Sequence, residues 1–192
     1  MAETITPVVH GGKRRPYLVA SALHVVGATL SAAALGFVLA AGGALLGAPW
    51  DPATPALVAG VAALYLLREA FRLPIPLPDR KRQVPEWWRT FFSPPTAAFL
   101  YGTGLGVGFL TYLSFGTFVA VMAGAFASGD LAEGASLCAA FGLGRSLAIP
   151  GVTSRNAPVV EKLDEIALGP VPRLANAGVL ALVMGTAAAS AL

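Results

Sequence analysis

The residues best suited to bind a solute or an ion in this chain are hydroxyl side chains spaced along a glycine-rich apolar stretch, Tyr101–Thr117. At 100° per residue, the small and hydroxyl side chains of this stretch share one broad helical face. They are Thr103, Gly106, Thr111, Ser114 and Thr117. Such a face lines a solute or ion path in some membrane proteins, but small residues four apart more commonly let two helices pack closely.

Three further polar side chains interrupt other apolar stretches. His24 shares a helical face with Ser31, and an imidazole at such a place serves proton or metal chemistry or bonds a neighbouring helix. Arg145 either binds an anion or extends to the membrane interface, and Asn176 is typical of a hydrogen bond between helices. The predicted ligand-binding residues are His24, Ser31, Thr103, Thr111, Tyr112, Ser114, Thr117, Arg145 and Asn176.

No pattern in the sequence indicates an active site. Apolar stretches contain neither a nucleophile beside a base nor paired carboxylates, and no His, Cys, Asp or Glu cluster has metal-ligand spacing. The single cysteine, Cys138, cannot form an intrachain disulfide. We therefore predict a protein that is not an enzyme, with no catalytic residues, no metal and no cofactor.

The composition requires these residues to sit in a membrane protein. Of 192 residues, 56% are hydrophobic and 12% are charged, and the mean hydropathy is +0.70. A soluble domain carries roughly 25% charged residues. Although the net charge is +3, the basic residues flank apolar stretches and do not line one soluble face, so nucleic-acid binding is not expected.

The apolar stretches are continuous, which excludes the alternating pattern of a membrane barrel and predicts helices. We expect an all-α polytopic fold with a cytoplasmic tail (1–16) and one transmembrane domain (17–192). Its five predicted spans cover about 17–47, 54–72, 96–128, 131–149 and 173–192. A helix needs about 20 apolar residues to cross a bilayer. A cleaved signal peptide is the alternative for the first span, but its apolar core exceeds the 7–15 residues typical of such peptides.

Charge placement predicts the orientation of these spans. All 13 Lys and Arg residues lie in the tail, in the connections on its side of the membrane, or near the ends of the predicted spans on that side. The opposite loops carry only Asp51, Asp130 and Glu133. Because Lys and Arg mark the cytoplasmic side, we expect a multi-pass inner-membrane protein with a cytoplasmic N-terminus and an extracytoplasmic C-terminus.

Each cytoplasmic connection also contains an amphipathic segment, at 84–92 and 158–168, which predicts two interfacial helices. The order of long span, shorter span and surface helix then occurs twice, pairing Gly27 with Gly104 and Arg68 with Arg145. We interpret this as two duplicated two-helix units plus one helix. The first and third spans exceed the thickness of a bilayer core, so they must tilt, break or protrude, and their glycines are suitable places.

The stretch Tyr101–Gly124, with its glycine-rich opening and the polar centre Thr111-Tyr112-Leu-Ser114, resembles the long helices of the CcdA/DsbD-type transmembrane domain. Ser21–Gly47 is similar to it. The resemblance implies a relative of the LysE-like exporter superfamily, whose members with this domain relay thiol–disulfide electrons to thioredoxin-like partners. Dithiol exchange is excluded here, since Ser31 and Thr111-Tyr112 occupy the positions of the family's cysteine pair. The family's inverted three-helix repeats also differ from the same-direction pairs expected here.

Three functions remain open on this evidence. The leading hypothesis is a small transport component that binds or moves a solute through a polar seam between the first, third and fifth spans. The alternative is a non-catalytic accessory or scaffold subunit of a larger membrane complex, and the third is a redox partner that uses Cys138 alone. The expected partners are the lipid bilayer and other membrane subunits or further copies of this chain.

Overall fold

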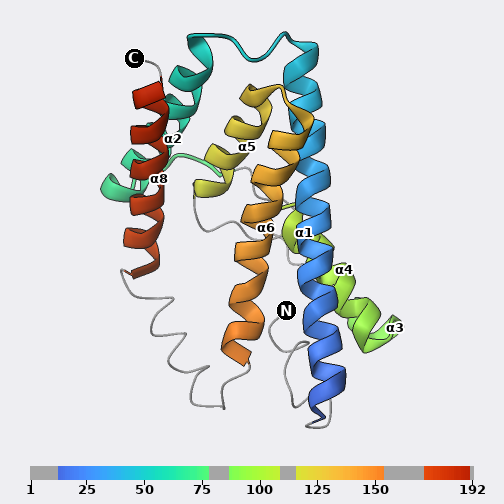
Figure 1. Ribbon diagram of the computed structural model, residues 1–192. Coiled ribbons are helices and arrows are strands. Elements are labelled where there is room, and N and C mark those ends of the chain that lie inside the picture. The colour runs from blue at the N-terminus through green and yellow to red at the C-terminus, as the bar shows by residue number, and fades with distance from the viewer. Residues whose placement is uncertain (1–12, 78–86, 109–115, 154–170, 191–192) are drawn as a thin grey trace. The chain divides into compact units, whose positions relative to one another are not determined.

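The computed structural model describes residues 13–77, 87–108, 116–153 and 171–190, and every regular element in them is an α-helix (Figure 1). This confirms the all-α prediction for the described part of the chain. The helices are α1 (Arg14–Leu45), α2 (Ala53–Phe71), α3 (Trp88–Phe91), α4 (Pro94–Gly106), α5 (Thr117–Ser128), α6 (Leu131–Thr153) and α8 (Val171–Ser190). The predicted interfacial helix at 158–168 lies outside the described residues.

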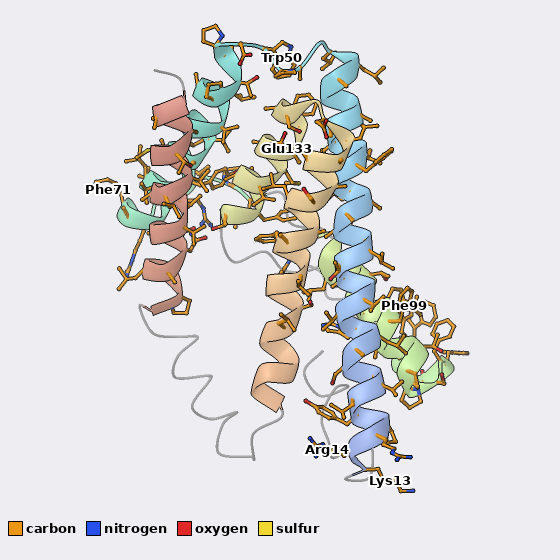
Figure 2. The ribbon with its side chains drawn as sticks, in the orientation of Figure 1. Lys13, Arg14, Trp50, Phe71, Phe99 and Glu133 are labelled. Atoms are coloured by element: carbon orange, nitrogen blue, oxygen red, sulfur yellow. The ribbon has the colours of Figure 1, made fainter. Side chains whose placement is uncertain are left out.

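Two described helices, α1 and α2, are long and apolar enough to cross a membrane, whereas α5 is apolar but shorter. Length and apolar composition do not distinguish a membrane span from a signal sequence near the N-terminus, where α1 lies. Figure 2 shows Lys13 and Arg14 where α1 begins. Five spans therefore remain a prediction.

The two longest predicted spans differ in continuity. Helix α1 runs unbroken over 32 residues. The segment predicted at 96–128 holds two helices instead, because α4 ends at Gly106 and α5 begins at Thr117. Gly108, just after α4, has a φ of 76°, a backbone conformation that glycine adopts without the steric cost other residues incur. The glycine-rich run thus ends a helix.

The chain divides into two compact units, each built around closely packed helices. The first contains the described residues of Met1–Ala32, Asp79–Tyr112 and Ala139–Leu168. Here α4 lies against α1 through glycines: a Cβ on Gly102 would collide with the carbonyl oxygen of His24, and one on Gly106 with that of Ala28.

Other small residues complete the packing of this first unit. Ala20 and Ala98 are fully buried beside Tyr17. Phe99 of α4, labelled in Figure 2, lies next to Gly27 of α1, where an added Cβ would meet its carbonyl oxygen. Since a Cβ at several of these positions would strike backbone, the two helices approach more closely than larger side chains allow.

The second unit contains the described residues of Ala33–Pro78, Leu113–Cys138 and Gly169–Leu192. Helices α2, α5 and α8 pack on one another around Ala62, Tyr65, Ala120 and Leu180. The C-terminal part of α1 contacts the start of α6, where a Cβ on Gly36 would collide with the carbonyl oxygen of Gly134.

The glycine contacts of the first unit give a direct test of helix packing. We expect Gly102→Ala to lower the free energy of unfolding by about 1–3 kcal/mol, because the new methyl group forces α4 away from α1. Gly144→Ala, on α6 of the same unit, is the matched control, since no described atom lies within 4 Å of its added Cβ. That control should gain about 0.5–1 kcal/mol from helix propensity. Unfolding in mixed micelles measures both, and equal effects would contradict the packing described here.

Candidate functional site

The structure distributes the predicted ligand-binding residues over both units. His24, Ser31, Thr103 and Arg145 belong to the first unit, whereas Thr117 and Asn176 belong to the second. Thr111, Tyr112 and Ser114 lie outside the described residues. Each group is therefore described by its own contacts.

His24 is completely buried between α1 and α4. Its Nδ1 lies 3.4 Å from the carbonyl oxygen of Ala98, which accepts a hydrogen bond when the proton is on Nδ1. In that tautomer Nε2 carries a lone pair, and no group in the described part of the chain forms a hydrogen bond with it. Nδ1 of this imidazole thus connects α1 to α4, whereas Nε2 has no partner among the described residues.

Ser21, three residues before His24, was missed by the sequence reasoning. It is 7% exposed, and its Oγ also lacks a hydrogen-bond partner within the residues that the structure describes. The spacing of three residues places both side chains on the same face of α1, a signal that was available from the sequence. Ser21 Oγ and His24 Nε2 are thus two neighbouring polar atoms on the buried side of α1 whose hydrogen bonds are unsatisfied among the described residues.

Ser31, further along α1 than His24, bonds Thr103 and so connects α1 to α4 at a second position. The Ser31 hydroxyl lies 3.0 Å from the carbonyl oxygen of Thr103 and donates to it, and the Thr103 hydroxyl donates to the carbonyl oxygen of Leu100 at 2.7 Å. Both hydroxyls therefore bond backbone carbonyl groups. The Ser31 bond joins α1 to α4, as hydroxyl bonds between packed helices do, whereas the Thr103 bond stays within α4.

Arg145 connects α6 to the last turn of α4. Its Nη1 donates to the carbonyl oxygen of Leu105 at 3.3 Å, and its side chain is half-buried. The carbonyl groups of a final helical turn carry partial negative charge, so a guanidinium there is favourable. The structure thus assigns Arg145 at least one helix-capping contact.

Thr117 and Asn176 form the polar contact of the second unit. The Thr117 hydroxyl, on the first residue of α5, donates to Oδ1 of Asn176 on α8. Asn176 is 7% exposed, and among the described residues its Nδ2 has no hydrogen-bond partner. The sequence placed both residues in the candidate set but did not indicate that they bond each other.

Cys138 and Ser146 are also packed inside the described part of the chain. Among the described residues, no three His, Cys, Asp or Glu side chains come together in a way that could hold a metal ion. Cys138 is 2% exposed and packs against Gly36, because a Cβ added to Gly36 would lie 2.7 Å from the Cβ of Cys138. Ser146, which is fully buried, donates to the carbonyl oxygen of Leu143 at 2.8 Å.

No family model matches the chain, and no solved structure matches it. Curated relatives do, and they share one name, methylamine utilization protein MauF. The relative from Paracoccus versutus is 35% identical over 130 residues, which cover 67% of this chain and 47% of the relative. Those from Methylophilus methylotrophus and Methylorubrum extorquens are each 34% identical, over 66% and 65% of this chain and 45% and 44% of their own lengths.

These relatives overturn two expectations. The resemblance to the CcdA/DsbD-type domain was wrong, because proteins at about a third identity carry the name MauF instead. The leading hypothesis of a transport component, and the broader expectation of a transport or membrane-complex subunit, were also wrong, because the relatives are named for methylamine utilization. A stripe of hydroxyls and glycines serves helix packing as well as a transport path, so the pattern did not separate the two.

The chain spans about half the length of the curated relatives it matches, and over about two thirds of its own length it is similar to MauF.

Proposed function

We propose that this chain is an accessory protein of methylamine utilization that acts through contacts with other proteins of that process. The observation that carries this proposal is its similarity, at 33–35% identity, to MauF from several organisms. The matched region amounts to two thirds of the chain, so the likeness is not limited to one helix.

The absence of a catalytic role is part of the same proposal. The hydroxyls of Ser31 and Thr103 donate to backbone carbonyl groups, and Arg145 donates to the end of α4. Groups that already bond backbone carbonyl groups are poorly placed to act as nucleophiles or bases on a substrate. This supports a protein that offers surfaces to partners and leaves the chemistry to them.

We further propose that the protein is embedded in the cytoplasmic membrane with five spans, a cytoplasmic N-terminus and an extracytoplasmic C-terminus. The candidate spans α1 and α2 support this, as does the placement of every Lys and Arg on one side. Several large apolar side chains are more than half exposed, including Leu30, Val38 and Leu182. Lipid chains would cover such side chains at no hydrophobic cost.

A chimera tests the role in methylamine utilization. The MauF of Paracoccus denitrificans is 33% identical to this chain over 129 residues. We expect that a strain without this MauF loses growth on methylamine and keeps growth on succinate. Replacing only the matched segment of that MauF with the corresponding residues of this chain should restore growth on methylamine.

Two variants of the chimera serve as controls. Gly144→Ala should support growth, whereas Gly102→Leu should not, because the larger side chain separates α4 from α1. A chimera that accumulates to the level of the native MauF without restoring growth on methylamine would overturn the proposal.

Reporter fusions test the membrane orientation separately. Alkaline phosphatase fused after Leu192 should be active and green fluorescent protein at the same place dark, because the C-terminus is expected outside. Green fluorescent protein inserted after Pro78 should fluoresce, since that connection is expected in the cytoplasm. Fluorescence of the C-terminal fusion would contradict an odd number of spans.

A further inference from the structure

The short helix α3 and the residue on either side of it carry a cluster of exposed aromatic rings in the first unit. Trp87 is 52% exposed and Phe91 is 79% exposed. Their ring centroids lie 5.8 Å apart, and the ring of Phe92 lies 6.3 Å from that of Trp87. Trp87, Phe91 and Phe92 form what we call the aromatic cluster. Exposed apolar surface of this kind is typical of a contact with a membrane or a partner.

Trp88 holds the aromatic cluster against α4. Its ring centroid lies 5.9 Å from that of Tyr101, and its side chain also packs against Ala97. Both of these neighbours belong to α4 and are buried. The position of the aromatic cluster is therefore set by α4.

Helices α4 and α1 run in the same direction. Gly102 approaches His24, and four residues further along both helices Gly106 approaches Ala28. Ala98, one turn before Gly102, accordingly packs with the residues near the start of α1. Because the aromatic cluster directly precedes α4, it lies toward the end of the first unit at which α1 begins.

Positive charge gathers at the same end of the unit. Lys13, Arg14 and Arg15 are exposed, and Figure 2 shows the first two where α1 begins. The described residues of the first unit also include Arg89 and Arg145, but they include no Asp and no Glu. Within these residues no carboxylate offsets the three exposed cations, so this end of the unit attracts anions.

The order of side chains along α1 matches a membrane boundary. The exposed cations end at Arg15, and the exposed apolar side chains begin at Leu18 and Val19, each about half exposed. Tryptophan is enriched where the hydrocarbon of a bilayer meets its headgroups, and Lys and Arg side chains extend from there to the headgroups. The aromatic cluster and the cations are thus spaced as that boundary requires.

We propose that the aromatic cluster inserts at the boundary of the cytoplasmic leaflet, and that Lys13, Arg14 and Arg15 bind lipids with an anionic headgroup there. Basic residues beside a span are attracted to anionic lipids. A phosphatidylglycerol headgroup carries a net negative charge, whereas the phosphate of phosphatidylcholine is neutralised by its own ammonium group. This inference rests on the membrane embedding proposed above and adds the class of lipid that the first unit prefers.

Fluorescence quenching by brominated lipids can measure this preference, because the chain contains three tryptophans, Trp50, Trp87 and Trp88. Trp50→Phe combined with Trp88→Phe leaves Trp87 as the reporter and keeps an aromatic ring against α4. The full chain is placed in vesicles of equal parts phosphatidylglycerol and phosphatidylcholine, with one or the other brominated near the headgroup. We expect Trp87 to associate with phosphatidylglycerol about two- to fivefold more strongly.

The opposite end of α1 supplies the matched control. Trp50 follows that end and donates Nε1 to the carbonyl oxygen of Leu46 at 3.0 Å, beside the carboxylate of Asp51. Trp87→Phe combined with Trp88→Phe leaves Trp50 as the reporter. Since no exposed cation adjoins it in the sequence, its quenching by the two brominated lipids should be equal.

Charge removal connects the preference to the start of α1. Lys13→Gln, Arg14→Gln and Arg15→Gln together should reduce the preference at Trp87 to about one. The phosphatase fusion after Leu192 checks that this variant keeps its orientation in the membrane. In the chain that retains all three cations, 1 M sodium chloride should have the same effect, because it shortens the Debye length to about 3 Å.

Flotation with the vesicles separates this inference from the membrane embedding. A chain that floats but shows equal quenching of Trp87 by both lipids, or none, would overturn the lipid preference and leave the embedding intact. A preference that persists at high salt and without the three cations would also overturn it. A chain that floats with neither lipid would overturn both proposals.

Discussion

The structure of this protein depends on close contact between helix backbones at glycines. In the first unit Gly102 and Gly106 of α4 approach the carbonyl groups of α1, and in the second Gly36 of α1 approaches Gly134 of α6. Inside a membrane, lipid is as apolar as a leucine side chain, so helices associate through such van der Waals contact and through hydrogen bonds between them. The polar contacts follow from this approach, because Ser31 reaches the carbonyl oxygen of Thr103 only where the two backbones come close.

The helical class and the role of the glycines could be predicted from the sequence. Continuous apolar stretches of this length admit only helices, and small residues four apart indicate close packing. Periodicity gives the face of a helix on which a residue lies, but it does not identify the neighbour opposite. For that reason the sequence grouped Thr117 and Asn176 with His24 and Ser31, whereas the structure describes contacts for the two groups in separate units. Ser21 was missed although its spacing of three residues from His24 places both side chains on one face of α1, because that spacing does not show which of the two lacks a hydrogen-bond partner.

Function was harder to infer than fold, for a physical reason. Hydroxyls, glycines and a lone histidine in apolar helices have the same appearance whether they line a solute path or bond a neighbouring helix. The structure shows Ser31 and Thr103 bonding backbone carbonyl groups, and the similarity to MauF points to methylamine utilization. Those two observations are the basis for proposing an accessory role in methylamine utilization.

The central claim is tested most directly by deleting the gene for this chain from the organism that encodes it and measuring growth on methylamine. The account predicts that growth on methylamine is lost, that growth on an unrelated carbon source and ammonium is unchanged, and that the intact gene restores the first. Growth on methylamine at the normal rate after deletion would contradict it.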